Sequence, residues 1–427
     1  MHRTGSEVKP DIALAERLFA ELRRRTSDDR GVTRASYGPG EELAHALARR
    51  EAERLNLDIE TDAACNLYMT LRGESDLPRI MIGSHLDSVP LGGNYDGAAG
   101  VLAGLAVVSG LAHAGQVPPR DVTVMAIRAE ESAWFNASYI GSRAAFGRLT
   151  PQELDTVQRS TDDLILSSTI DAAGGRSEAL RRGQSHLTPA EIGFFVEPHI
   201  EQGPVLVNKE VPIGVVTEIR GSFRYRRASC RGAYGHSGAT PREGRQDAVR
   251  ALATLIVELD ALWSRMDDAG EDLTVTVGQV RTDPKEVSFS KIAGLVEFSL
   301  DVRSGSHETL ARASAELDSL IDRISRDQKV IFDLGPRTGS DPASMHPVVI
   351  AALESAARDL RIPALKMPSG AGHDAATFAA MGVPTGMLFL RNENGSHNPD
   401  EHLDMADFAL GADILLRLCL GPPDFGQ

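Results

Sequence analysis

Five candidate metal ligands lie in five separate segments of this chain. They are three histidines and two acidic residues, namely His85, Asp96, Glu131, His199 and His397. Four of them come shortly after an apolar run typical of a β-strand, such as residues 79–83 before His85. Imidazole and carboxylate together suit zinc and related divalent metals. Because sites in open α/β sheets assemble beyond the carboxyl ends of the strands, the pattern predicts the active site of a metal-dependent hydrolase.

The five residues divide into two predicted metal sites. A hydrolase with two metal ions needs a carboxylate that can bridge both ions and terminal ligands for each. Asp96 directly precedes an apolar, helix-like segment, where a carboxylate is favoured, and it is the predicted bridge. His85 and His199 would complete one site, and Glu131 and His397 would complete the other.

Two further acidic residues lie beside these ligands. If Glu131 binds metal, its neighbour Glu130 can point toward the catalytic water and take its proton, since a general base must lie within hydrogen-bond reach. Asp87, two residues after His85, is placed to orient the His85 imidazole. A single histidine at a strand end is more often a core or capping residue, and paired glutamates are usually exposed. The joint occurrence of all these residues argues against that interpretation.

The amino-acid composition excludes several classes of protein. The chain has 427 residues, 42% hydrophobic and 25% charged, which is ordinary for a globular protein. Its formal net charge of −15 argues against binding to nucleic acid. We find neither an apolar signal segment at the N-terminus nor an apolar run that could span a membrane. Three cysteines without a CxxC pair suit a reducing compartment, so we expect a cytoplasmic enzyme.

Strand-like and helix-like segments alternate through both ends of the chain, which predicts an α/β fold with a mixed, mostly parallel sheet. The expected helices are residues 10–27, 40–56 and 97–114. The expected strands are residues 79–83, 122–129, 194–196 and 386–390. The candidate ligands come from both ends, so these ends must fold together.

The middle of the chain has a different order of predicted strands and helices. Its segments follow the order strand, helix, strand, strand, helix, strand, which is the split βαβ arrangement. They cover residues 223–230, 245–266, 273–280, 295–302, 307–324 and 330–334. We therefore expect a small domain, residues 220–335, inserted into a catalytic domain formed by residues 1–219 and 336–427.

The chain resembles the metal-dependent amidohydrolases of the M20 peptidase group. Within that group it is similar to the branch that holds N-carbamoyl-L-amino acid hydrolases, allantoate amidohydrolase and β-ureidopropionase. Matching segments extend over nearly the whole chain and include residues 31–34, 92–97, 130–131, 141–143, 199–206, 369–375 and 396–401. The sequences His-Ile-Glu-Gln-Gly-Pro (199–204) and Ser-Gly-Ala-Gly-His-Asp-Ala (369–375) are typical of this branch.

The resemblance carries several expectations. It implies the same five ligands for two divalent ions per subunit, with zinc the first choice and manganese, cobalt or nickel as alternatives. It implies Glu130 as the general base. It also implies a ferredoxin-like lid domain through which two subunits form a homodimer.

Residues of the substrate site are also implied by the resemblance. His236 would reach the partner subunit's active site and stabilise the oxyanion of the reaction. Arg303 would bind a substrate carboxylate. Gln202 and Gly372, which belong to the two segments typical of the branch, are further candidate contacts with the substrate, as is the position of Ser290.

Three departures from the family pattern concern the substrate site. Ser290 stands where the family typically has an asparagine, and Arg242 where it usually has a methionine. The loop of residues 391–397 is shorter and more polar than in carbamoylases. The expected substrate is an N-carbamoyl-L-amino acid or a ureide, and the alternative is an N-acyl amino acid. A non-catalytic homologue is a remote alternative, because the ligands and the base are all present.

Overall fold

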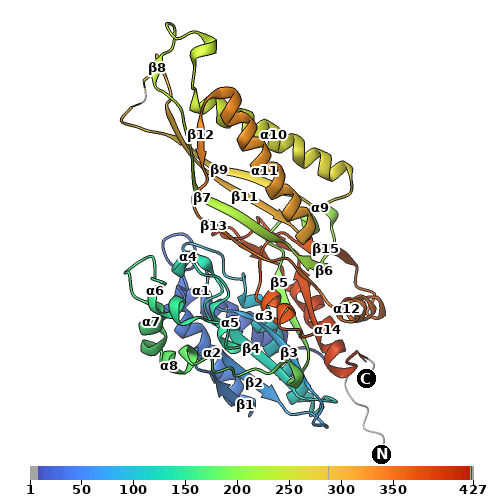
Figure 1. Ribbon diagram of the computed structural model, residues 1–427. Coiled ribbons are helices and arrows are strands. Elements are labelled where there is room, and N and C mark those ends of the chain that lie inside the picture. The colour runs from blue at the N-terminus through green and yellow to red at the C-terminus, as the bar shows by residue number, and fades with distance from the viewer. Residues whose placement is uncertain (1–7, 287, 424, 426–427) are drawn as a thin grey trace, which may run out of the picture. The chain divides into compact units, whose positions relative to one another are not determined.

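The computed structural model describes residues 8–286, 288–423 and 425. The chain divides into two compact units, one formed by Met1–Thr217 with Ser344–Gln427 and the other by Glu218–Ala343 (Figure 1). The inserted domain expected for residues 220–335 overlaps the second unit. This unit ends later because β13 (Arg337–Ser340) adds to its sheet by pairing with β7 (Gly221–Arg231).

A mixed sheet forms the centre of the first unit. Its strand order is β1 (Asp58–Thr61), β2 (Leu67–Leu71), β4 (Val122–Ile127), β3 (Arg79–His85), β5 (Ile192–Ile200), β16 (Thr385–Leu390), β6 (Ile213–Ile219) and β14 (Ala343–Ser344), and β15 (Ala364–Ser369) pairs with β6. The central strands β4, β3, β5 and β16 are mutually parallel. Antiparallel strands flank them. The predicted α/β class with a mixed sheet and a parallel centre is confirmed.

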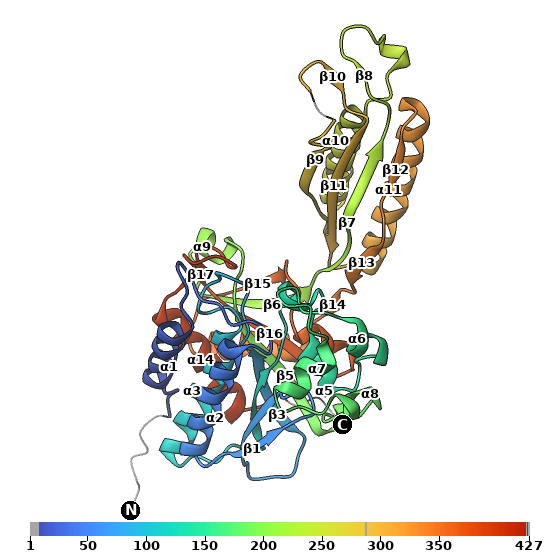
Figure 2. The same cartoon turned by 90° about the vertical axis from the view of Figure 1, so that its left-hand side faces the viewer.

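Two groups of helices cover this sheet (Figure 2). One hydrophobic core joins the strands to α1 (Ile12–Thr26), α2 (Pro39–Arg54), α3 (Ala98–Ala114), α12 (Pro347–Asp359) and α14 (Met405–Leu420). Another lies among α4 (Ser132–Phe135), α5 (Ile140–Ala145), α6 (Pro151–Thr156), α7 (Leu166–Ala172) and α8 (Ser177–Arg181). The short helices α9 (Val205–Lys209) and α13 (Ala375–Ala380) complete the unit. The three helices expected in the N-terminal part are confirmed as α1, α2 and α3.

Helix α3 packs unusually close to the sheet. It is rich in alanine and glycine, and all its residues from Ala98 to Leu111 are buried. A Cβ at Gly100 would collide with the Pro198 carbonyl of β5 and with Ser84 of β3. This close packing brings the N-terminus of α3, and with it Asp96, to the carboxyl ends of β3 and β5.

The second unit follows the predicted order of elements. These are β7, α10 (Ala248–Asp268), β9 (Thr274–Thr282), β11 (Leu295–Ser304), α11 (His307–Gln328) and β12 (Ile331–Asp333). The strands form an antiparallel sheet in the order β12, β7, β11, β9. Both helices pack on one face of this sheet through a core that includes Leu255, Leu259 and Leu317. The short strands β8 (Gly235–His236) and β10 (Lys291–Ile292) form a separate pair.

Two observations bear on compartment and membrane. None of the described helices is long and apolar enough to cross a membrane. Cys65, Cys230 and Cys419 are buried free thiols.

Candidate metal centre and active site

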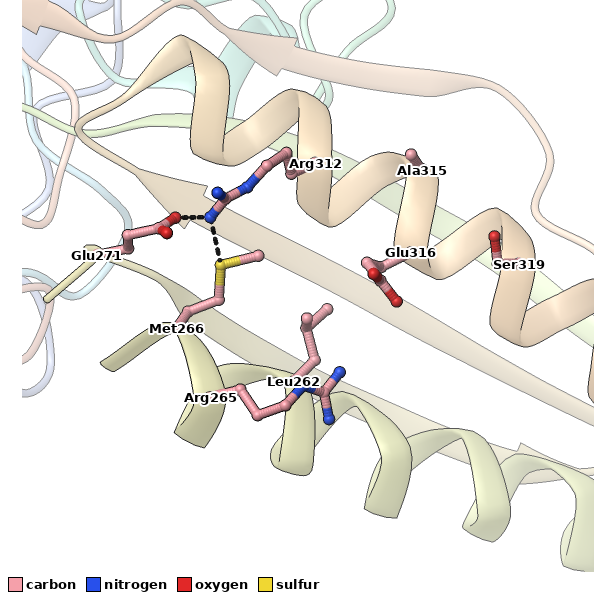
Figure 3. Close-up of a pocket in the computed structure, with 8 residues that line it drawn as sticks. All are labelled: Leu262, Arg265, Met266, Glu271, Arg312, Ala315, Glu316 and Ser319. Atoms are coloured by element: carbon pink, nitrogen blue, oxygen red, sulfur yellow. Dashed lines mark hydrogen bonds and ion pairs between the residues drawn. The ribbon is translucent and has the colours of Figure 1, made fainter. Parts of the chain in front are cut away.

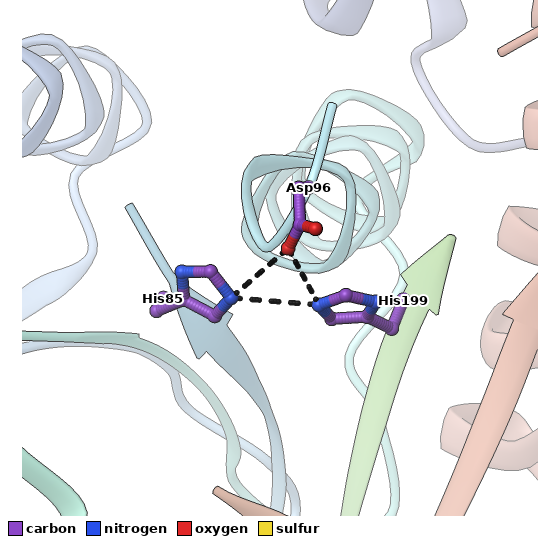
Figure 4. A group of neighbouring side chains, drawn as sticks. All are labelled: His85, Asp96 and His199. Carbon is purple, nitrogen blue, oxygen red and sulfur yellow. Dashed lines mark hydrogen bonds and ion pairs between the residues drawn. The ribbon is translucent and has the colours of Figure 1, made fainter. Parts of the chain in front are cut away.

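The first group of ligands forms where β3 and β5 end side by side. His85 is the last residue of β3, and His199 is the penultimate residue of β5. Their Nε2 atoms lie 3.4 Å apart. Asp96 Oδ1 lies 3.4 Å from His85 Nε2 and 3.1 Å from His199 Nε2 (Figure 4). All three side chains are buried and point toward one another.

The sequence placed these two histidines just beyond their strands, and this detail was wrong. Backbone pairing of β3 with β4 continues to His85, and pairing of β5 with β16 continues to Ile200. Both histidines therefore project from regular strand, where the parallel ladder fixes their backbone positions.

The second group of ligands shares Asp96 with the first. His397 Nε2 lies 3.6 Å from Asp96 Oδ2 and 3.3 Å from Glu131 Oε1. Glu131 follows β4, and His397 lies in the loop between the short paired strands β17 (Asn392–Glu393) and β18 (His402–Leu403), which come after β16. Asp96 thus presents one carboxylate oxygen to each group, as a bridging ligand must.

The two groups fit divalent cations. The candidate ligand atoms within each group all lie within 4.8 Å of one another. Asp96 Oδ1 and Glu131 Oε1 are buried against the histidine nitrogens of their own groups, and no described residue gives either oxygen a well-aligned hydrogen bond. Buried carboxylate oxygens without well-aligned donors are unfavourable, and a cation between the ligands would satisfy them. Mixed histidine and carboxylate ligands accept zinc, and also manganese, cobalt or nickel.

The ligand side chains shift one another's pKa values. Burial raises the pKa of Asp96, but the charge and hydrogen bonds of His199 and His85 outweigh burial and hold that pKa well below its ordinary value. A hydrogen bond with Glu131 raises the pKa of His397 to about 9. A cation must therefore displace a proton from His397 before this residue can act as a ligand.

We expect metal affinity at the second group to rise with pH. His397 is protonated below its pKa of about 9, so the apparent affinity increases between pH 7 and 9 and levels off above that range. The increase is at most about tenfold per pH unit for one displaced proton. Competition with a fluorescent chelator at a series of pH values measures this. An affinity that stays constant from pH 7 to 9 would contradict it.

Glu130 lies beside the first group. It follows Ala129, which has a φ of 52°, so the chain turns sharply after β4. Glu130 Oε2 is 4.0 Å from His85 Nε2. The side chain is buried, and burial together with the negative charge of Glu131 raises the pKa of Glu130 well above its ordinary value. A carboxylate in this place can accept a proton from a water held by the first group.

Asp87 connects the base to the ligands. His85 Nδ1 lies 3.1 Å from the Asp87 backbone carbonyl and 3.4 Å from Asp87 Oδ1. The two carboxylate oxygens of Asp87 also accept the backbone N–H groups of Glu130 and Glu131, at 3.1 and 3.2 Å. Ser36 Oγ donates to Asp87 Oδ2 at 2.6 Å. Asp87 therefore contacts the ligand His85 and also holds the turn that carries Glu130. The sequence predicted only the contact with His85.

Glu401 is a functional residue that sequence reasoning missed. One of its oxygens accepts the backbone N–H groups of Tyr95 and Asp96, at 2.7 and 3.1 Å. Its other oxygen lies 2.8 Å from Ser396 Oγ, which also contacts Asp96 Oδ2. Glu401 thus holds the loop of Asp96 against the loop of His397. Its place in the matching segment 396–401 was the available signal, but neither its type nor its spacing indicated the role.

Arg34 was also missed. It is completely buried. Its guanidinium donates to the Leu86 carbonyl at 2.9 Å and to the Asn94 side chain at 3.3 Å. Arg34 thereby joins the two segments that follow His85 and precede Asp96, and it places a positive charge near the acidic ligands.

The expected substrate contacts of the first unit lie at the centre. Gln202 Nε2 donates to Asp96 Oδ2 at 2.8 Å and lies 3.4 Å from His397 Nε2. Gly372 faces Tyr139, because a Cβ at this glycine would overlap the Tyr139 hydroxyl. Tyr139 in turn donates its backbone N–H to the Glu130 carbonyl at 3.2 Å. Gln202 therefore contacts two candidate ligands, and Gly372 packs against the side chain of Tyr139.

The other expected contacts belong to the second unit. His236 is exposed in β8, and its Nδ1 accepts the backbone N–H groups of Gly238 and Ala239, at 3.2 and 3.1 Å. Ser290 accepts the Ser237 N–H through its backbone carbonyl at 2.9 Å. Arg303 lies on β11. These residues are thus carried by the predicted lid rather than by the unit that holds the ligands.

A different hollow in the second unit lacks every predicted site residue. It has a volume of about 430 Å³ and lies between α10 and α11, where Arg312 pairs with Glu271 and contacts Met266 (Figure 3). Its lining mixes apolar stems with charges of both signs, and we assign no function to it.

Comparisons with known proteins identify the family of this chain. The model of Peptidase family M20/M25/M40 matches residues 81–421. The chain is 34% identical over 387 residues to the N-carbamoyl-L-amino acid amidohydrolase of Geobacillus stearothermophilus, covering 90% of this chain and 92% of that protein. It is 32% identical over 389 residues to the allantoate amidohydrolase of Escherichia coli (strain K12), covering 90% and 91%.

A solved structure is similar along the whole chain. It is an amidase of the hydantoinase/carbamoylase family from Burkholderia multivorans, with a TM-score of 0.87, 27% identity, and coverage of 97% of this chain and 98% of that one. The resemblance inferred from the sequence motifs is confirmed. The chain therefore belongs to peptidase family M20/M25/M40, in the branch of the N-carbamoyl-L-amino acid and allantoate amidohydrolases.

Proposed function

We propose that this protein is a metal-dependent amidohydrolase that cleaves a linear ureido or amide C–N bond in a small carboxylate-bearing substrate. An N-carbamoyl-L-amino acid or a ureide is the preferred substrate class. The two ligand groups that share Asp96, with Glu130 beside them, carry this proposal. The names of the amidohydrolase relatives support the substrate class.

Each residue of the centre has its own role in the proposed reaction. Bound divalent ions would polarise the scissile carbonyl and make a water molecule more acidic. Glu130 takes the proton of the attacking water and passes it to the leaving nitrogen. Asp87 keeps Glu130 in place through the backbone of the turn. Glu401 keeps Asp96 and His397 in register by joining their loops.

His236 is suited to stabilise the oxyanion. Because its Nδ1 accepts two backbone N–H groups, the neutral imidazole carries its proton on Nε2, which can then act as a donor. Donors aimed at the developing negative charge typically contribute a few kcal/mol to catalysis. Following the family, we propose that this donor acts in the active site of the partner subunit.

A homodimer formed through the second unit is part of this proposal. Its helix α10 exposes Val249, Ile256 and Val257, and its edge strand β9 exposes Val280. Apolar side chains gathered on one element are a feature of interaction surfaces. We also place the enzyme in the cytoplasm, because its three cysteines are free thiols.

Mixing two inactive variants tests the shared active site. We expect Glu130→Gln and His236→Ala each to lose most activity, whereas subunits mixed after unfolding or co-expressed regain roughly a quarter of it through heterodimers with one intact site. Turnover of the mixture measures this. No recovery, with heterodimers confirmed by native mass spectrometry, would show that His236 acts in its own subunit or outside catalysis.

An N-acyl amino acid is a second candidate substrate on the same centre. Ser290 in place of asparagine and the polar loop of residues 391–397 favour it. The test incubates metal-reconstituted enzyme with N-carbamoyl amino acids, allantoate and N-acyl amino acids, and mass spectrometry follows ammonia, amine and organic acid separately. Ammonia from a carbamoyl compound or ureide supports the preferred class. Amine and an intact organic acid without ammonia would assign the enzyme to amide conjugates.

A further inference from the structure

The sheet of the second unit has one polar face. Helices α10 and α11 cover the opposite face, where Phe223 and Tyr225 of β7 and Leu300 and Val302 of β11 enter the core. Because side chains alternate along a strand, the residues between these point to the polar face. That face therefore receives Arg224 from β7 and both Asp301 and Arg303 from β11.

Asp301 lies between two arginines on this face. Arg303 pairs with it through two contacts, Nε to Oδ1 at 3.1 Å and Nη2 to Oδ2 at 2.9 Å. Arg224 is its direct cross-strand neighbour, with Nε 3.2 Å from Asp301 Oδ2. The Arg224 Nε is nevertheless buried and makes no well-formed hydrogen bond with any described residue. One carboxylate thus serves two guanidinium groups, and a buried donor is left over.

A cavity of about 400 Å³ opens over these residues. Among the described residues its lining includes three arginines, Arg224, Arg226 and Arg303, and one acidic residue, Asp301. Thr276, Gln279 and Ser299 add small polar groups. The cavity is therefore positively charged in a protein whose formal net charge is −15. A local excess of arginine in an acidic protein favours an anionic ligand.

The spacing of the arginines fits a ligand with two carboxylates. Arg303 faces Ser222 and Arg224 faces Asp301, so the two arginines are diagonal neighbours, with backbones about 7–8 Å apart. Long arginine side chains starting at this spacing can converge on two carboxylates of one small molecule. Arg303 is the residue expected from the family to bind one carboxylate, and Arg224 and Arg226 line the same cavity, where they can contact the other.

We propose that the substrate is a dicarboxylate, namely the N-carbamoyl or N-acyl derivative of an acidic amino acid, with its second carboxylate bound by Arg224 and Arg226. This inference rests on the proposed function and narrows its substrate class. It is independent of the choice between carbamoyl and acyl groups, because the arginines recognise the amino acid part.

Paired substrates of nearly equal shape test the inference. The metal-loaded enzyme is given N-carbamoyl-L-aspartate against N-carbamoyl-L-asparagine, and N-carbamoyl-L-glutamate against N-carbamoyl-L-glutamine, with the N-acetyl compounds in parallel. We expect kcat/KM to favour the charged member of a pair by about 10- to 100-fold, as charge-assisted hydrogen bonds allow. Arg224→Gln and Arg226→Gln should each reduce this preference, mainly through KM for the charged member. The preference is a ratio within one protein, so partial misfolding does not change it.

Arg231→Gln is the matched control, since Arg231 is exposed on the same strand but outside the cavity lining, and it should keep the wild-type preference. Equal kcat/KM for charged and neutral members would overturn the inference while leaving the proposed function in place. A strong preference that both Arg224→Gln and Arg226→Gln retain in full would also overturn it, because the second carboxylate would then bind elsewhere. Failure to cleave any compound of the panel would remove the proposed function together with the inference.

Discussion

Replacing Glu130 with glutamine lowers kcat by about 10²–10⁴-fold while metal content stays unchanged. Glutamine has nearly the same shape as glutamate, but its amide cannot take a proton from water. Glu130 belongs to neither of the two groups of candidate ligands, although its Oε2 lies 4.0 Å from His85 Nε2. The measurement is single-turnover kinetics together with metal analysis by mass spectrometry.

Glu131→Gln is the matched control for this prediction. The change in chemistry is the same, but Glu131 belongs to the second group of ligands, so metal should be lost together with activity. Near-normal turnover by Glu130→Gln would refute its role as base. Metal loss in both variants would instead make Glu130 a ligand.

Removing the Glu401 carboxylate weakens metal binding at the second group. In Glu401→Ala the backbone N–H groups of Tyr95 and Asp96 lose their acceptor, and Ser396, in the same loop as His397, loses its contact with Glu401. Loss of residues that orient metal ligands typically costs 10–100-fold in metal affinity. We expect metal analysis to show about one retained ion after dialysis where the unmodified enzyme keeps two.

Two companion variants separate positioning from general damage to the loop. Glu401→Gln keeps an acceptor oxygen for the backbone N–H groups, so it should restore most of the metal affinity. Asp400→Ala removes an exposed neighbouring acid and should leave metal binding unchanged. If Glu401→Ala binds two ions as tightly as the unmodified enzyme, the loops do not need Glu401 to place Asp96 and His397.

Local patterns in the sequence were sufficient to predict the central sheet, the candidate ligands and the order of elements in the second unit. Apolar strand-like runs with a histidine or acid at their ends predicted a parallel sheet with ligands at its carboxyl edge, and β3, β4, β5 and β16 have that arrangement. The different pattern of strand-like and helix-like segments in the middle of the chain predicted the order of elements in the second unit. These predictions succeed because strand and helix periodicity are properties of neighbouring residues.

Tertiary structure alone decided how the ligands are held and shared. The bond from Asp96 to Glu401 joins residues 305 positions apart, and the contact of Gln202 with Asp96 spans 106 positions. Arg224 meets Asp301 only because the pairing of β7 with β11 places these two residues opposite each other. Spacing along the chain contains no information about such contacts. They depend on which strands become neighbours and on how two loops close over one carboxylate, so they emerge only when the whole sheet is assembled.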